Sequence, residues 1–219
     1  MTEPLPSSKP SRPRWIIPLF IIGGLALVGI NVFYGLSMLR QPSNQQTPTA
    51  ETLNNPIPSF SFTDQAGHLF DRSKLDGKVW VASFIFTRCP GPCPVISQNM
   101  SVIHQAFLDN PNVVLVSFSL DPEYDSPEVL TAYAEGHQAT YPQWRFLTGA
   151  KEKIHQLSMN DFYSAVLETD PETAKDAGPI IHGTRISVID QNGTLVAAYN
   201  GVTNVGTQQV ISKVKDLLK

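Results

Sequence analysis

The chain contains little cysteine and little charge. Only two of its 219 residues are cysteine, charged residues make up 16%, and no internal repeat is apparent. The formal net charge is -3, and no lysine or arginine cluster occurs beyond the amino-terminal flank, so the basic surface of a nucleic-acid-binding protein is missing. Two cysteines also argue against a structural zinc site, because such sites usually close with four Cys or His ligands. Any thiol chemistry of the protein must therefore involve this pair.

The amino-terminal region predicts a membrane anchor. Residues 15–39 contain no charged side chain, and about 20 apolar residues are enough to cross the hydrocarbon layer as a helix. Basic residues are concentrated in residues 1–14, with only Arg40 just after the run, so we expect a cytoplasmic tail and an extracytoplasmic remainder. A cleaved signal peptide is the alternative, but its apolar core is usually shorter and residues 34–39 make a poor cleavage site. We expect a single-pass protein, most simply of a bacterial inner membrane with its main domain in the periplasm.

The remainder divides into a linker and one domain. Residues 40–56 are rich in Gln, Pro, Asn and Thr and poor in large apolar residues, which predicts a flexible tether. Residues 57–219 have ordinary mixed composition and enough length for a single core.

Apolar patterning within residues 57–219 predicts alternating strands and helices. Residues 79–86 and 113–119 are apolar on both parities, as strands buried on both faces are. Helices are expected from Pro94 to Phe107 and from Ser126 to about His137. The remaining expected elements are hairpin strands at 60–63 and 68–70, a strand at 144–147, a helix at 150–159, a strand at 162–167, a hairpin over 186–199 about an Asn-Gly turn, and a terminal helix through 210–217. This order predicts an α/β fold, a thioredoxin-like mixed sheet flanked by helices, with an amino-terminal hairpin and one preceding transmembrane helix.

The two cysteines lie between a predicted strand and a predicted helix, in the sequence TRCPGPCP at residues 87–94. Cys93 falls at the helix start, where unpaired N–H groups and the macrodipole favour an anion and should lower the thiol pKa. Arg88 adds a positive charge next to Cys89. A thiolate both binds metal and attacks disulfides, so these features suit either copper binding or disulfide exchange.

The spacing of the cysteines also permits both functions. Three residues separate Cys89 from Cys93, where thioredoxin-type redox centres have two. Four residues of helical rise span about 6 Å, within the range that a disulfide tolerates. Two soft thiolates select copper(I) over hard cations, and a neighbouring imidazole would complete a three-coordinate site.

Three segments resemble the Sco/SenC family of cytochrome oxidase assembly proteins. Residues 87–94 match the family's T-x-C-P-x-x-C-P, and residues 119–127 are similar to its S-x-D-P-x-x-D-[TS]-P. His182 precedes the predicted hairpin as the family's histidine does. The resemblance covers nearly the whole chain. It implies that Cys89, Cys93 and His182 are copper ligands.

The same resemblance implies a function and partners. A family member delivers copper to the binuclear site of an oxidase subunit, which implies that subunit and a thioredoxin-like reductant as partners. The chain departs from the family at Gly183, where Ser is common, and in the acidic run at residues 165–177. The function expected is a membrane-anchored copper metallochaperone. The alternative is a thiol-disulfide oxidoreductase that keeps oxidase or cytochrome cysteines reduced.

Other readings of these residues carry less weight. A structural disulfide would close a very short loop and so constrain the unfolded chain little. A thiol peroxidase would need P-x-x-x-[TS]-x-x-C, which is missing. Asp121 and Asp125 either orient the site as acceptors for an imidazole N–H, bind a partner, or simply end a strand and begin a helix.

The other histidines and methionines are not expected to bind metal. His104 lies about 16 Å along the helix from Cys93, and Met100 is expected in the core. No motif surrounds Met159, His68, His137 or His155. The three histidines are expected at the surface.

Overall fold

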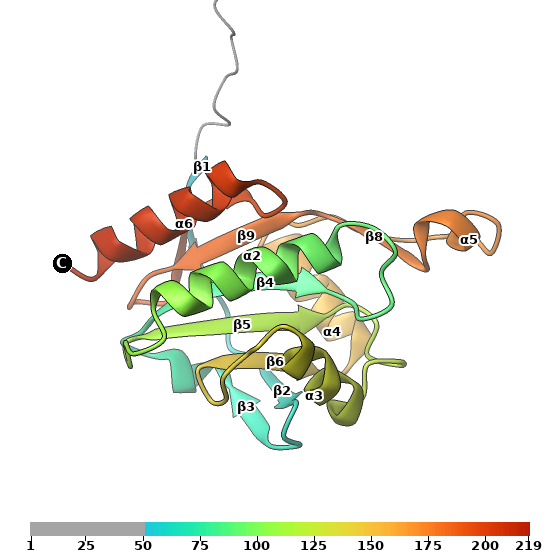
Figure 1. Cartoon of the computed structure of the whole chain (residues 1–219), viewed down its shortest axis with the longest axis horizontal. Helices are drawn as coiled ribbons and strands as arrows, with labels where there is room; N and C mark the ends of the chain where they lie inside the picture. Colours follow the sequence, from blue (N-terminus) through green and yellow to red (C-terminus); the bar gives the residue numbers. More distant parts are fainter. Residues whose placement is uncertain (1–50) are drawn as a thin grey trace, which may run out of the picture. The chain divides into compact units, whose positions relative to one another are not determined.

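The computed structural model describes residues 51–219, which form a mixed eight-stranded sheet with helices on both faces (Figure 1). The strand order is β1-β10-β9-β4-β5-β6-β2-β3, and β7 and β8 form a separate two-stranded sheet. The predicted anchor at 15–39 and most of the predicted linker lie outside the described residues. Within residues 51–219 no helix is long and apolar enough to cross a membrane.

The strands are β1 (Glu51–Pro56), β2 (Ser61–Asp64), β3 (Leu69–Asp71), β4 (Val79–Ile85), β5 (Val113–Ser119), β6 (Trp144–Thr148), β7 (Val166–Glu168), β8 (Ile180–His182), β9 (Arg185–Ile189) and β10 (Thr194–Asn200). The helical segments are η1 (Arg72–Leu75), α2 (Cys93–Ala106), α3 (Pro127–Gly136), α4 (Lys151–Gln156), the π-helical η2 (Leu157–Asp161), α5 (Ala174–Ala177) and α6 (Asn204–Leu217).

Strand β4 is the centre of the sheet. It pairs in parallel with β5 and antiparallel with β9, and all seven of its residues are buried. Continuous apolar sequence gives such a strand because both of its faces are covered. On one face Trp80 and Phe84 pack against Phe118 and Phe162 in a cluster of aromatic rings.

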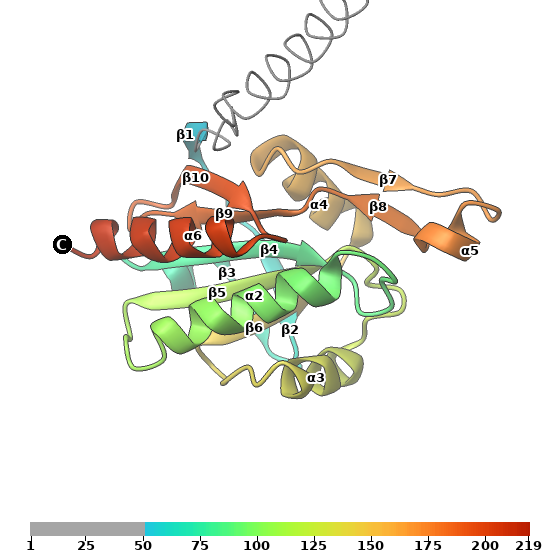
Figure 2. The same ribbon diagram turned by 45° about the horizontal axis from the view of Figure 1, so that its top comes forward.

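Helices α2 and α6 cover the other face of the sheet (Figures 1 and 2). Each presents a buried stripe, which in α2 includes Ile96, Met100 and Ile103. On this face the Ser83 and Ser117 hydroxyls are 2.9 Å apart, and the Trp144 indole N–H donates to the Ser117 hydroxyl. Helix α2 therefore begins at the carboxyl end of β4 with its orientation fixed by the sheet.

Strands β7 and β8, with α5 between them, project from the end of the sheet where α2 begins (Figure 2). Lys151 of α4 forms an ion pair of 2.6 Å with Glu168 of β7, which ties this hairpin to the main domain. Residues 165–177, which depart from the family pattern, thus form β7, α5 and the turn between them.

The thioredoxin-like layout predicted from the sequence is confirmed, with three local corrections. Residues 51–56 form edge strand β1 against β10 instead of ending the linker, because backbone groups of a polar segment complete the sheet edge. The helix predicted at 150–159 ends as α4 at Gln156 and continues as the π-helical η2. The strand predicted at 162–167 is shifted to Val166–Glu168, because Phe162 is buried in the aromatic cluster.

Candidate metal centre

Cys89 lies in a turn after β4, and Cys93 is the first residue of α2. The Cys89 backbone N–H donates to the Phe86 carbonyl at 3.3 Å, which closes this turn. Pro94 occupies the first turn of α2, where the missing N–H costs no hydrogen bond. The sequence therefore places both sulfurs at the end of the sheet where β4 stops.

His182 is brought to the same place by β8. It lies opposite Val166 of β7, and the Gly183 N–H donates to the Ala165 carbonyl at 2.9 Å. The imidazole also meets the Phe86 ring edge-on, with 5.8 Å between ring centres. The projecting hairpin thus brings His182 next to Cys93, although the two residues are 89 positions apart in the sequence.

The three side chains form one compact group. Their ligand atoms, two sulfurs and one ring nitrogen, all lie within 4.8 Å of one another. Cys93 Sγ and His182 Nε2 are 3.0 Å apart. Cys93 is fully buried, whereas Cys89 and His182 each retain 8% of their exposure. The group is therefore largely shielded from bulk water, and its residual exposure is at Cys89 and His182.

Hydrogen bonding orients the imidazole for metal binding. His182 Nδ1 lies 2.8 Å from the Gly183 carbonyl oxygen, which can only accept, so Nδ1 carries the proton in the neutral ring. Nε2 is then unprotonated and presents its lone pair toward Cys93 Sγ. The suggestion that Asp121 or Asp125 accepts the imidazole N–H is therefore wrong, because a backbone carbonyl occupies that position.

Asp125 instead holds the segment that leads into Cys89. Its buried carboxylate accepts hydrogen bonds from the Thr87 backbone N–H at 3.1 Å, the Thr87 hydroxyl and the Ser119 hydroxyl. Burial raises the pKa of Asp125, and these hydrogen bonds oppose the rise. The start of α3 is capped by its neighbour Ser126, whose hydroxyl accepts from the Val129 N–H. Asp125 thus supports the cysteine turn.

Asp121 pairs with Arg88 at 2.6 Å, between Arg88 Nε and a carboxylate oxygen. The guanidinium also lies 4.7 Å from the ring centre of Tyr124. The positive charge of Arg88 is therefore paired with Asp121 and is not an unpaired charge beside the thiols. Sequence reasoning singled out both carboxylates but not their partners, since only the folded chain brings residues 87 and 88 against residues 119–125.

The two thiols have opposite pKa shifts. A hydrogen bond from the Cys93 thiol lowers the pKa of Cys89 to about 4; burial opposes this shift, and the backbone N–H groups of Cys93 and Gly91 add to it. The same hydrogen bond to Cys89, together with burial, raises the pKa of Cys93. The prediction of a lowered pKa for Cys93 is therefore wrong, because the N–H groups near the start of α2 point to the Cys89 sulfur.

This asymmetry predicts a distinct pH dependence of alkylation. A pKa lowered to about 4 keeps Cys89 as the reactive thiolate above that pH, so in the reduced, copper-free protein its alkylation by iodoacetamide should already be near its plateau at pH 6. Cys93 should react far more slowly. Peptide mass spectrometry of samples quenched from pH 3 to pH 9 measures both rates. A Cys89 rate that climbs tenfold per unit from pH 6 to pH 8 contradicts the assignment.

Gly178 joins the projecting hairpin to the cysteine turn. Its φ is +81° and its ψ 173°, and a Cβ on it would lie 2.8 Å from Cδ of Pro90. Such a backbone conformation is essentially restricted to glycine. Gly178 thus lets the segment that leads to His182 pack directly on the Cys-Pro-Gly-Pro-Cys turn, a contact with no signal in the sequence.

Replacing Gly178 with alanine should separate the hairpin from this turn. The expected cost is about 1–3 kcal/mol for the strained backbone, together with a copper(I) affinity lowered about tenfold as His182 moves. Urea unfolding and a copper competition titration measure the two effects. Gly136→Ala is the matched control, because a Cβ there meets nothing within 4 Å. Equal behaviour of the two variants would show that the contact does not position His182.

Gly183, one of the two departures from the family pattern, also fits its surroundings. A Cβ on Gly183 would lie 2.6 Å from the Ser164 hydroxyl oxygen, which is buried and has no hydrogen-bond partner among the described residues. A serine at position 183 would therefore collide with Ser164. Glycine at position 183 thus leaves room for the Ser164 hydroxyl without displacing His182.

The remaining candidate side chains lie outside this group. Met100 is buried in the core, as expected, and His104 is buried against the Trp144 ring. His68 is exposed, as predicted. His137 and His155 are half-buried instead of exposed, and His155 Nε2 lies 2.8 Å from the Leu120 carbonyl oxygen.

Comparisons of the sequence and of the structure with known proteins point to the same family. The sequence matches SCO1/SenC over residues 48–219. The solved structure of a SCO1/SenC family lipoprotein from Bacillus anthracis str. Ames is 36% identical with a TM-score of 0.70, covering 77% of this chain and 98% of that one. BsSco, described as having a disulfide switch and as a member of the Sco family of cytochrome c oxidase assembly proteins, is 31% identical with a TM-score of 0.65, covering 79% and 98%.

A more distant structure shares the fold. ScoI of Bradyrhizobium japonicum, solved with copper bound, is 23% identical with a TM-score of 0.61, covering 74% of this chain and 99% of that one. Each of these solved chains is covered almost completely by the part of this chain that carries the core. A domain equivalent to residues 48–219 therefore folds without further sequence, and that fragment is suitable for experiments.

Proposed function

This chain belongs to the SCO1/SenC family, and from that premise we propose that it is a copper-binding metallochaperone that assists assembly of a copper site in cytochrome c oxidase. The observation that carries the proposal is the compact group of two sulfurs and one imidazole nitrogen within 4.8 Å. Soft thiolates with one imidazole favour copper(I) over hard cations. The copper in the Bradyrhizobium japonicum structure and the oxidase-assembly family of BsSco support the same assignment.

The protonation state of the group suits a cargo ion. Cys89 is a thiolate near neutral pH, and the neutral ring of His182 turns its unprotonated Nε2 toward the sulfurs, so the Cys93 proton is the one that must leave this arrangement when copper(I) binds. The cysteine turn stays accessible on one side, where Pro90 and Gly91 are exposed. A ligand of a receiving protein can approach there and replace the three donors one after another, with no change in the oxidation state of the metal.

Exposed apolar side chains near the thiols support docking of a receiving oxidase subunit. Val95, Tyr124 and Ile181 are 46%, 50% and 46% exposed. Val95 is two residues from Cys93, Tyr124 packs on Arg88, and Ile181 precedes His182. Apolar groups gathered around a reactive group are typical of a protein interaction site. An anchor at residues 15–39 would keep this face near a membrane-bound oxidase on the extracytoplasmic side.

Copper(I) titration of the reduced 48–219 fragment tests the proposal. Under anaerobic conditions, with a colorimetric chelator as competitor, we expect one copper(I) per chain. His182→Ala should weaken binding at least 10- to 100-fold, because loss of a ligand should cost no less than loss of a residue that supports a metal site. The matched control is His155→Ala, which removes an imidazole outside the group and should leave affinity unchanged. Weak binding by the wild type, or equal binding by the two variants, would contradict copper transport.

A thiol-disulfide oxidoreductase is the second candidate function. The lowered pKa of Cys89 favours it, because a thiolate attacks a disulfide and the neighbouring Cys93 can resolve the mixed disulfide. A thioredoxin-like partner would then return the pair to the dithiol. Turnover of a protein disulfide by the reduced fragment, unaffected by His182→Ala, is the expected result for this function. An absence of exchange would remove it.

A further inference from the structure

A cavity lies at the opposite end of α2 from the thiols. It has a volume of about 450 Å³, within the range of sites that hold small molecules. It is formed by η1 and the strand before it, the connection between α2 and β5, and the segment before β6. The lining residues used below are Phe70, Lys74, Lys78, Leu108, Tyr141 and Arg145. We call it the Tyr141 cavity.

The Tyr141 cavity carries an excess of positive charge. Lys74 Nζ donates to the Leu69 carbonyl, and Lys78 Nζ donates to the Pro111 carbonyl at 2.8 Å. Within residues 51–219 neither ammonium group forms an ion pair, so each keeps N–H donors and an unmatched charge. Asp109 is the only acidic residue among the described lining residues, against three basic ones.

Apolar and aromatic side chains form the rest of the wall. The Arg145 guanidinium lies between two rings, 4.8 Å from the centre of Phe70 and 4.6 Å from that of Tyr141, and its charge is matched by the buried Asp64. Leu108 and Tyr141 remain 38% and 43% exposed at the cavity. The wall therefore offers apolar contact and a stacking surface, while the two lysines supply the unmatched charge.

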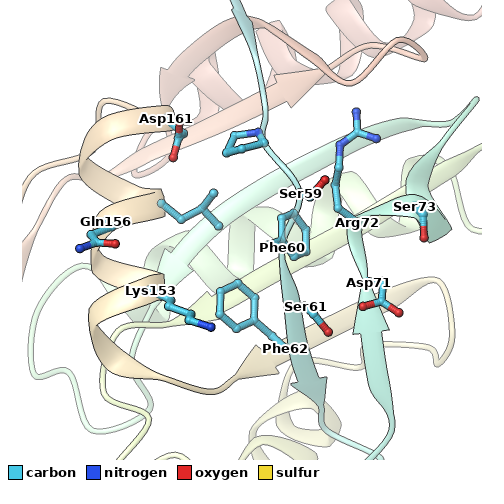
Figure 3. Close-up of a pocket in the computed structure, with 12 residues that line it drawn as sticks. Ser59, Phe60, Ser61, Phe62, Asp71, Arg72, Ser73, Lys153, Gln156 and Asp161 are labelled. Carbon is cyan, nitrogen blue, oxygen red and sulfur yellow. The ribbon is translucent and has the colours of Figure 1, made fainter.

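A larger cavity has a different charge balance. It has a volume of about 550 Å³ and lies beside β2, β3 and α4 (Figure 3). Arg72 and Lys153 line it together with Asp71 and Asp161, and Arg72 is also paired with Asp76. Positive and negative charges are thus matched in number, so this cavity does not favour an anion.

The distance from the thiols makes the Tyr141 cavity a separate site. Helix α2 has 14 residues, a length of about 21 Å at 1.5 Å per residue. Cys93 is its first residue, and Leu108 and Pro111 follow its end. A small ligand in the cavity therefore does not contact the copper-binding group.

We propose that the Tyr141 cavity binds a small amphipathic anion, with an apolar, preferably aromatic, body against Leu108 and Tyr141 and an acidic group between Lys74 and Lys78. This pairing follows from the two unmatched ammonium groups beside an apolar, aromatic wall. It is independent of the proposed copper function.

Binding of naphthoate and its neutral amide, naphthamide, to the 48–219 fragment tests this site. Amide NMR spectra at low salt should show naphthoate shifts confined to residues 70–78, 108–114 and 140–145. Naphthamide should bind more weakly at the same residues. The Lys74→Gln and Lys78→Gln variants should each weaken naphthoate binding about three- to fivefold and leave naphthamide unchanged, and added salt should reduce the difference.

Matched variants distinguish specific binding at this site from nonspecific binding. Lys153→Gln removes the same charge from the charge-balanced cavity and should leave naphthoate binding unchanged. Leu108→Asn should weaken both ligands, because it removes apolar contact. The proposal is overturned if naphthamide binds as tightly as naphthoate, if the shifts map to residues 58–62 and 153–161, or if no saturable shift appears. Copper(I) affinity should be the same in all of these variants.

Discussion

Replacing either Cys89 or Cys93 with serine should lower copper(I) affinity by more than 100-fold. Each change replaces a soft sulfur donor with a hydroxyl that is a poor ligand for copper(I). The loss should exceed the 10- to 100-fold that follows removal of a residue supporting a metal site. Chelator competition on the reduced 48–219 fragment measures it. Each single variant keeps two of the three donors, which are not enough to complete the site. The double variant, which keeps only His182, should therefore show no further measurable loss of copper(I) affinity.

The serine variants keep the volume of the side chain nearly unchanged, so the fold should persist. Circular dichroism and urea unfolding of the copper-free proteins check this point. Ser97→Ala, one helical turn after Cys93 on α2, is the control for altering this part of the helix. A serine variant that folds normally and retains copper(I) affinity within tenfold of wild type would show that its sulfur is not a ligand.

Replacing Asp125 with alanine should destabilise the reduced fragment by about 2–4 kcal/mol. The carboxylate accepts from the Thr87 N–H, the Thr87 hydroxyl and the Ser119 hydroxyl, and its loss leaves these buried donors unpaired. An unsatisfied buried group costs about 1–3 kcal/mol. Trp80 and Trp144 are fully buried, so their fluorescence during urea unfolding reports the change.

Glu123→Ala is the matched control for Asp125→Ala. Its side chain is 77% exposed and lies 3.9 Å from Lys151, so removing it should change stability by less than about 0.5 kcal/mol. Asp125→Asn, which keeps one acceptor oxygen, should fall between the two. A cost for Asp125→Ala as small as that of Glu123→Ala would mean that this carboxylate does not support the cysteine turn.

The elements that the sequence predicts well are those whose local signals agree with the fold. The buried strands β4 and β5 follow from apolar residues on both parities, and the β9–β10 hairpin follows from its Asn-Gly turn. Helix α3 begins after Ser126, whose hydroxyl caps it, as its sequence indicates. In each case hydrophobic period, turn chemistry and capping point to the same structure.

The elements missed depend on backbone pairing and on contacts between distant segments. Strand β1 has the sequence ETLNNP, which carries no strand pattern, and it is held by hydrogen bonds to β10 across a register shift. Strands β7 and β8 pair with each other outside the main sheet, so the polar run at residues 165–177 gives no periodic signal. Composition describes side chains, whereas these segments are ordered by their main chain.

The candidate site shows the same division. The motif at residues 87–94 locates both sulfurs, and the resemblance to the Sco/SenC family points to His182, which the structure brings beside them. The direction of the thiol pKa shifts and the acceptor for the imidazole N–H depend on neighbours that only the fold defines. Residue identities thus indicate the donor set, and the tertiary structure determines their protonation.

X-ray absorption at the copper edge of the copper(I)-loaded 48–219 fragment tests the donor set most directly. We expect a first shell of two sulfur atoms and one imidazole nitrogen from Cys89, Cys93 and His182. The nitrogen and the outer-shell scattering of the ring should disappear in His182→Ala, while the sulfur shell remains. A wild-type spectrum that contains sulfur alone, or one that His182→Ala leaves unchanged, would contradict the proposed copper site.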